Sequence, residues 1–300
     1  MTNPHQGAPA PSLDHATVLT ILSGIILAMF LAALDQTIVA TALPTIGNEL
    51  GDLKNLGWVV SAYLLSSTAV TPLYGKLSDI HGRRPVLMIA IAVFVAGSIA
   101  CALAPTMLGL IIARFVQGLG GGGLISLAQT VIADVVAPKE RARYQAYIGS
   151  VFGASSVAGP VLGGFIAEAV HWSWIFWINV PLGIVAFLMT SSALKKLPRH
   201  ERPHKLDLLG AVLMVAAALT LLLALTWGGV SYPWGSVEIL GLLAVSLVLW
   251  TLFILRVRSA PEPFVPVDVL LDRVVASGTG AAFFAVGTMV GLSIYMPLYF

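Results

Sequence analysis

Charged residues and cysteine are scarce in this sequence. Charged residues make up 10% of the 300 residues and hydrophobic residues 58%, with a mean hydropathy of +0.92. Soluble domains are about a quarter charged, so this chain must be solvated mainly by lipid. The single cysteine, Cys101, excludes an internal disulfide. The small net charge of +2, without basic groups interleaved with aromatics, excludes a nucleic-acid surface.

Motifs for phosphate, metal and enzyme chemistry are also missing from the sequence. There is no Gly-x-x-x-x-Gly-Lys-Ser/Thr loop, no metal-binding cluster of Cys and His, and no nucleophile with a base and an oxyanion site. Residues 118–123 match Gly-x-Gly-x-x-Gly, but they lie in an apolar run with no strand before them, which favours close helix packing. We therefore expect no enzyme, no cofactor and no metal, and an ion gradient as the energy source.

Nine runs of mostly apolar residues follow a short polar tail. Residues 1–16 contain no Lys or Arg, so they lack the basic start of a signal peptide and are typical of a disordered tail. Each run has about the 20 residues that a helix needs to cross a bilayer, and none alternates as a barrel strand would. The expected class is an all-α membrane protein with spans near 17–42, 57–78, 86–104, 107–133, 142–168, 173–194, 207–227, 237–256 and 275–299.

The basic residues indicate which way the chain crosses the membrane. Of the 16 Lys and Arg residues, 14 lie in alternate connections between the nine runs. The exceptions are Lys54, on the opposite side, and Arg114, within the fourth run. By the positive-inside rule, the N-terminus and the basic connections are cytoplasmic.

Two ionisable residues fall inside predicted spans. Asp35 in the first run and Arg114 in the fourth each lie about seven residues, or ~10 Å, from the outer end, so both are expected at a similar depth. An intramembrane carboxylate is costly and is functional by default. We expect Asp35 to take up and release the coupling proton and Arg114 to modulate it; structural pairing of the two is the alternative.

The stretch GKLSDIHGRRP, residues 75–85, connects the second and third runs. An ordinary hairpin loop would need its basic residues for orientation, but it would not need Asp79. The positive partial charge at the start of the third helix disfavours arginines there unless carboxylates compensate them. We expect a charge latch that holds one conformation of the bundle, with glycines for close helix approach and a tight turn. Its residues are Gly75, Asp79, Gly82, Arg83, Arg84 and Asp134.

This stretch resembles the Gly-x-Leu-x-Asp-x-x-Gly-Arg-Arg signature of the major facilitator superfamily of secondary transporters. Gly159-Pro160 and Gly163-Gly164 in the fifth run resemble the Pro-Gly motif of its proton-coupled antiporters, with a simple helix kink as the alternative. LDQTIVATALP (34–44) and WSWIFWINVPLG (172–183) are similar to the fourteen-helix drug:proton antiporter branch, EmrB/QacA-like. Ala40 and Ser155 depart from the usual Asn and Gly of these motifs.

The resemblance implies a major facilitator fold of which this chain is the N-terminal portion, in a fragment or truncated product. The six-helix bundle would consist of two inverted three-helix repeats, and Pro-x-x-Gly in both the second and the fifth run fits such a repeat. The implied layout is a cytoplasmic tail (1–16), the six-helix bundle (17–194), a cytoplasmic linker (195–206), two extra helices (207–256), a cytoplasmic loop (257–274) and the first helix of an incomplete second bundle (275–300).

The implied function is proton-coupled export of drugs or other amphipathic small molecules by alternating access. The implied location is the plasma membrane, or the inner membrane of a bacterium, with a periplasmic adaptor as partner in a two-membrane bacterium. Possible cavity residues are Gln36, Tyr63, Gln117 and Asn179. Two alternatives stay open: an exporter of one specific metabolite, peptide or siderophore, and a membrane remnant that assembles with a partner without transporting.

Overall fold

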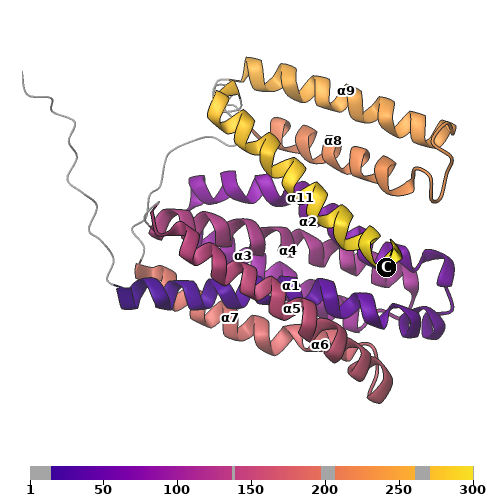
Figure 1. Ribbon diagram of the computed structural model, residues 1–300, viewed down its shortest axis with the longest axis horizontal. Helices are drawn as coiled ribbons and strands as arrows, with labels where there is room; N and C mark the ends of the chain where they lie inside the picture. Colours follow the sequence, from indigo (N-terminus) through magenta and orange to yellow (C-terminus); the bar gives the residue numbers. More distant parts are fainter. Residues whose placement is uncertain (1–14, 137–138, 197–206, 261–270, 300) are drawn as a thin grey trace, which may run out of the picture.

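The computed structural model describes residues 15–136, 139–196, 207–260 and 271–299. Within these ranges the chain is helical apart from short connections (Figure 1). The helices are α1 (His15–Leu50), η1 (Leu53–Asn55), α2 (Gly57–His81), α3 (Arg83–Ala102), α4 (Met107–Val135), α5 (Arg141–Ala169), α6 (Trp174–Trp177), α7 (Asn179–Ala193), η2 (Leu194–Lys196), α8 (Leu208–Trp227), α9 (Val237–Ser259) and α11 (Arg273–Tyr299).

Eight spans in the described ranges are long and apolar enough to cross a membrane. They coincide with the first eight predicted runs, and α6 and α7 together form the sixth. The ninth predicted run falls on α11, which is not among the eight and whose side chains are described only in part. Most of the expected tail, linker and second loop, at 1–14, 197–206 and 261–270, lies outside the described residues.

The first helix is longer than the sequence predicts. α1 continues through Pro44 to Leu50, past the expected end at residue 42. A proline inside a helix removes one backbone hydrogen bond, which packing against neighbouring helices can offset in a membrane protein. Ile46, beyond the proline, is fully buried in the core, so the last turns of α1 are held by the bundle.

Helices α1 to α7 pack in a pattern that matches an inverted repeat. α1 packs against α5, and α4 packs against α2. α1 also packs against α7, and α4 against α3. A pseudo-two-fold axis that exchanges the first three spans with the next three would map the α1–α5 contact onto the α4–α2 contact. It would also map the α1–α7 contact onto the α4–α3 contact.

Glycines on α4 bring it into close contact with two neighbours. A Cβ atom at Gly118 or Gly122 would collide with the backbone of α2 at Tyr63 or Ser67, and one at Gly120 would collide with α3 at Phe94. Small residues allow this approach in membranes, where packing rather than the hydrophobic effect drives helix association. The glycine run at 118–123 therefore serves helix packing.

Helices α8 and α9 form a separate pair beside the bundle. They lie side by side, and α8 packs against α2 (Figure 1). Asp207 caps α8 by accepting a hydrogen bond from the Gly210 amide (3.1 Å), and it also pairs with Nε of Arg256 on α9 (3.0 Å). This ion pair joins the N-cap of α8 to the last turn of α9.

Candidate functional site

A layer of polar side chains divides the apolar core of the bundle. Along α1, buried residues up to Ala33 belong to one apolar cluster and those from Ile38 onward to another. α3 and α4 pass between the same two clusters. Asp35 on α1 and Arg114 on α4 both fall in the gap, so the charged groups share one buried level of the bundle.

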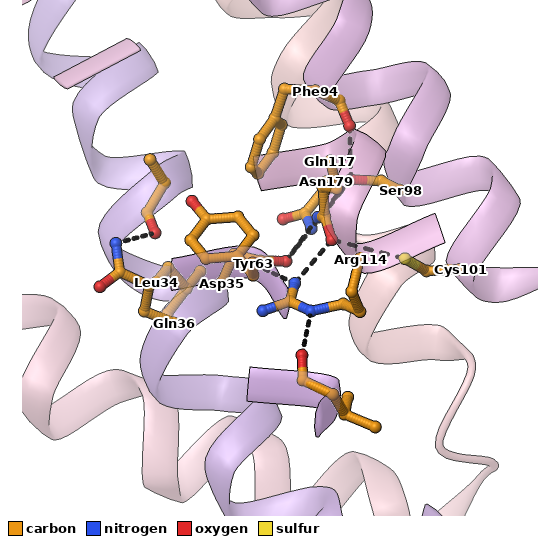
Figure 2. Close-up of polar contacts among 12 residues, drawn as sticks. Leu34, Asp35, Gln36, Tyr63, Phe94, Ser98, Cys101, Arg114, Gln117 and Asn179 are labelled. Carbon is orange, nitrogen blue, oxygen red and sulfur yellow. Dashed lines mark hydrogen bonds and ion pairs between the residues drawn. The ribbon is translucent and has the colours of Figure 1, made fainter. Parts of the chain in front are cut away.

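Asp35 and Arg114 form a direct ion pair. Nη1 of Arg114 lies 2.5 Å from Oδ2 of Asp35. The two side chains are 0% and 1% exposed, so water does not screen the pair. Figure 2 shows them pointing toward one another from their two helices. The sequence predicts a similar depth for these residues, and the structure joins them without an intervening group.

Further contacts fix the guanidinium group of Arg114. Its Nε donates to the carbonyl of Val59 (2.9 Å), and its Nη1 also donates to Oε1 of Gln117 (2.6 Å). The guanidinium carbon lies 4.3 Å from the centre of the Tyr63 ring, in cation–π geometry. Arg114 therefore ties together α1, α2 and its own helix.

The second carboxylate oxygen of Asp35 accepts from two amides. Nε2 of Gln117 and Nδ2 of Asn179 each lie 2.8 Å from Oδ1. Both amide nitrogens also donate to Oγ of Ser98, at 2.8 and 3.3 Å. Asp35 thus accepts three hydrogen bonds, one of them charge-assisted (Figure 2).

The four expected cavity residues do not share one environment. Gln117 and Asn179 are 0% and 1% exposed and bind Asp35, so in this conformation they are part of a closed network and do not line an open cavity. Tyr63 is buried, and its hydroxyl has no hydrogen-bond partner in the described part of the chain. Gln36 is half-buried and donates to the carbonyl of Ala32 (3.3 Å).

A second charge cluster lies where α2, α3 and α4 meet. Arg83 pairs with Asp79 through Nη1 (2.6 Å) and with Asp134 through Nε (2.8 Å). Its Nη1 also donates to Oγ of Ser78 (2.5 Å). The cluster is half-exposed, and it holds the ends of α2 and α4 against the start of α3. The charges expected to form a latch on Arg83 are therefore in contact.

Two expected members of the latch behave differently. Arg84 contacts neither carboxylate; it donates to the carbonyl and the hydroxyl of Ser191 on α7, both at 3.0 Å. A Cβ atom at Gly75 would meet nothing within 4 Å in the described part of the chain, so Gly75 makes no close approach to any described helix. Gly82 has φ +89 and ψ 153, a conformation open essentially to glycine alone, and it makes the tight turn between α2 and α3.

The Pro-Gly motif faces α1 next to Asp35. A Cβ atom at Gly159 or Gly163 would collide with the side chain of Thr37 or Thr41, so these glycines set the approach of α5 to α1. Thr37 also donates to the carbonyl of Ser155 (2.8 Å). Pro160 lies inside α5 without ending it, and a Cβ atom at Gly164 would meet no described residue within 4 Å.

Sequence reasoning missed two residues of the polar layer. Ser98 accepts from both amides that bind Asp35, and Cys101 donates through Sγ to Oε1 of Gln117 (3.5 Å). Both lie on α3, in an apolar run without a recognisable motif. The only available signal was a small polar residue, Ser98, within a predicted span.

A bundle of membrane-length helices with a buried ion pair at its centre is the architecture of a multi-pass membrane protein. The comparisons agree with this class, since the model of the Major Facilitator Superfamily matches residues 25–300. The chain belongs to the Major Facilitator Superfamily, a family of transporters and not of enzymes.

Several curated relatives are similar over nearly the whole chain. It is 39% identical over 279 residues to "Multidrug transporter protein MdtP" of Bacillus subtilis (strain 168), covering 93% of this chain and 51% of the relative. The chain is 37% identical to "Multidrug resistance protein 3" of the same organism, and the match covers 95% of this chain and 55% of that relative. "Efflux pump dotC" of Dothistroma septosporum is 37% identical, and the match covers 98% of this chain and 51% of that relative. The chain thus spans about half the length of these relatives.

Solved structures share the fold at low identity. The human organic anion transporter MFSD10 (TETRAN) has a TM-score of 0.57 and 18% identity, covering 78% of this chain and 60% of that one. A D-xylose–proton symporter has a TM-score of 0.53 and 17% identity, covering 80% and 68%. These values support the major facilitator fold alone.

Proposed function

We propose that this chain forms the N-terminal bundle of a secondary transporter that exports amphipathic small molecules in exchange for protons. The observation that carries the proposal is the carboxylate of Asp35, buried at the centre of the bundle beside Arg114. An ionisable group in such a place marks a proton or ion pathway by default. The relatives named as a multidrug transporter, a multidrug resistance protein and an efflux pump support export as the direction of transport.

The chemistry of coupling follows from the partners of Asp35. As a carboxylate, Asp35 holds α1 against α4 and α7 through Arg114, Gln117 and Asn179. A proton on Asp35 removes the charge that attracts Arg114, whereas the bonds of Arg114 to Val59 and Gln117 remain. Proton binding therefore weakens the contacts between helices at one level of the bundle, which is the kind of bistable element that alternating access needs.

Two further features belong to the same cycle. The cluster of Arg83 with Asp79 and Asp134 is proposed to stabilise this conformation and to open in the other one. Gly159 and Gly163, which set the approach of α5 to α1, are proposed to let these two helices slide beside Asp35.

Alternating access requires two bundles that move about a shared site. Because this chain spans about half the length of its curated relatives, we assign transport to an assembly that also supplies a second bundle. We propose that it lies in the plasma membrane with its N-terminus in the cytoplasm, as the positive-inside rule requires. In a two-membrane bacterium, a periplasmic adaptor would extend the export path.

Everted membrane vesicles provide the test. Vesicles that contain the protein, expressed from its complete reading frame, are given an inside-acid pH gradient. Accumulation of the lipophilic cation ethidium inside them is followed by fluorescence. We expect accumulation with the unaltered protein and with Glu238→Gln, which changes an exposed carboxylate on α9, and none with Asp35→Asn. Accumulation by Asp35→Asn that still depends on the gradient would refute the assignment of the proton site.

A further inference from the structure

The two amides that bind Asp35 are held in different ways. Oε1 of Gln117 accepts a charge-assisted hydrogen bond from Arg114 (2.6 Å), so Nε2 of Gln117 is the end that faces Asp35. A half-turn of this amide would place its NH₂ group against the guanidinium. Gln117 can therefore act only as a donor toward Asp35.

Asn179 has no such restraint. Its Nδ2 donates to Asp35 (2.8 Å) and to Oγ of Ser98 (3.3 Å). The hydroxyl hydrogen of Ser98 is used for the carbonyl of Phe94 (3.0 Å), which is why Ser98 accepts from the amides (Figure 2). Among the described residues, no donor binds Oδ1 of Asn179. A half-turn of the Asn179 amide therefore does not place its NH₂ group against a guanidinium, as a half-turn of Gln117 would.

The present network suits an ionised Asp35 and conflicts with a protonated one. A carboxylate only accepts, whereas a carboxylic acid must also donate its hydroxyl hydrogen. Oδ2 faces Arg114, so an added proton belongs on Oδ1, where both amides now point their N–H groups. One amide has to offer an acceptor instead, and only Asn179 is free to do so.

We propose that Asn179 is the positioning residue that responds to the proton on Asp35. It donates to the carboxylate, and it turns by half a turn about Cβ–Cγ to accept from the acid hydroxyl. This proposal rests on the proposed function, because it supposes that Asp35 takes up a proton. One proton is added from water, no other covalent bond changes, and the Ser98 hydroxyl turns from the Phe94 carbonyl toward Oδ1 of Asn179.

The position of Asn179 suits a residue that passes this change on. It is the first residue of α7, directly after Ile178, which keeps helical backbone angles where α6 meets α7. Pro181, two residues later, has no N–H group with which to bond the carbonyl of Trp177, so one backbone hydrogen bond is missing at this junction. A change in the Asn179 side chain therefore acts on a part of the sixth span that the backbone holds less firmly.

The other ionisable groups around Asp35 are few. Arg114 from α4, Tyr63 from α2 and Cys101 from α3 interact electrostatically with it or with its partner. α5 faces this part of α1 with Gly159 and Gly163, and α7 contributes the neutral Asn179. Arg114 stays charged over the accessible pH range, so Asp35 is the group whose titration Asn179 would follow.

Infrared difference spectroscopy between alkaline and acidic pH tests the proposal on the purified protein expressed from its complete reading frame. We expect a carboxylic-acid carbonyl band that is missing in Asp35→Asn. In Asn179→Leu the band should persist at a higher wavenumber, because the acid hydroxyl has lost its acceptor. In Gln117→Leu the band should keep its wavenumber, because Gln117 only donates toward Asp35 and is not the acceptor of the acid hydroxyl.

Asparagine labelled with ¹³C at its side-chain carbonyl gives a second readout that needs no change at Asn179. Its labelled band should shift to lower wavenumber as Asp35 is protonated, and should not shift in Asp35→Asn. An unchanged acid band in Asn179→Leu, or no shift of the labelled band, would overturn the role of Asn179. An acid band that survives Asp35→Asn would overturn the proposed proton site itself, so the two failures are distinguishable.

Discussion

Replacing Arg114 by alanine should remove more stability than any other single arginine replacement in the bundle. The change leaves the buried carboxylate of Asp35 with two neutral donors and no cation, and it removes one donor each from Oε1 of Gln117 and the carbonyl of Val59. Breaking a buried ion pair by removing one partner costs about 3–5 kcal/mol. At about 2 °C per kcal/mol for a chain of this size, the midpoint of thermal unfolding should fall by about 6–10 °C.

Tryptophan fluorescence during heating in detergent micelles measures this midpoint. Arg84→Ala is the matched control, because Arg84 is only partly buried and hydrogen-bonds Ser191 without an ion pair. It should cost about 1 kcal/mol.

A double variant separates the pair from the individual residues. Asp35→Asn with Arg114→Ala removes both charges, so its loss of stability should be smaller than the sum of the two single losses by at least about 1 kcal/mol. If the stability losses of the two single variants simply add in the double variant, the reasoning that the ion pair stabilises the bundle is refuted. A midpoint of thermal unfolding for Arg114→Ala as high as that of Arg84→Ala would refute it as well.

Three further changes have expected outcomes that the same unfolding assay or a transport assay can check. Gly82→Ala should destabilise by about 1–3 kcal/mol because of its positive φ; an unchanged midpoint would contradict the tight turn. Ser155→Ala should stabilise by about 1 kcal/mol, since the Ser155 hydroxyl is buried without a partner in the described residues; a loss of stability would point to a partner. Arg83→Gln should slow ethidium export while the protein still inserts and folds, and full export would argue against the charge cluster with Asp79 and Asp134 as a gate.

Features that depend on one stretch of sequence were predictable. The first eight spans follow from hydropathy alone, because a backbone in lipid must satisfy its own hydrogen bonds and the helix is the local way to do so. Asp35 and Arg114 stood out for the same reason, as charges in apolar runs. The family signature at residues 75–85 pointed to Asp79, Arg83 and their neighbours.

Features that depend on the register between helices were not predictable from sequence. Asn179 and Gln117 were expected to line a cavity, and only the packing of α4 and α7 against α1 reveals that they bind Asp35. Ser98 gave no signal, because serine is common in membrane helices and its importance lies in the two amides that it faces. Within the described residues, the open space beside Gly75 likewise reflects which helix face meets a neighbour, which spacing within one helix does not fix.

The most direct measurement counts the protons that leave the purified protein when a lipophilic cation binds. Ethidium is added to the protein in weakly buffered detergent, and the change in pH is calibrated with known acid. The account predicts release that depends on Asp35, present in the unaltered protein and in Glu238→Gln and absent in Asp35→Asn. Equal release from Asp35→Asn and the unaltered protein would contradict the claim that this carboxylate carries the coupling proton.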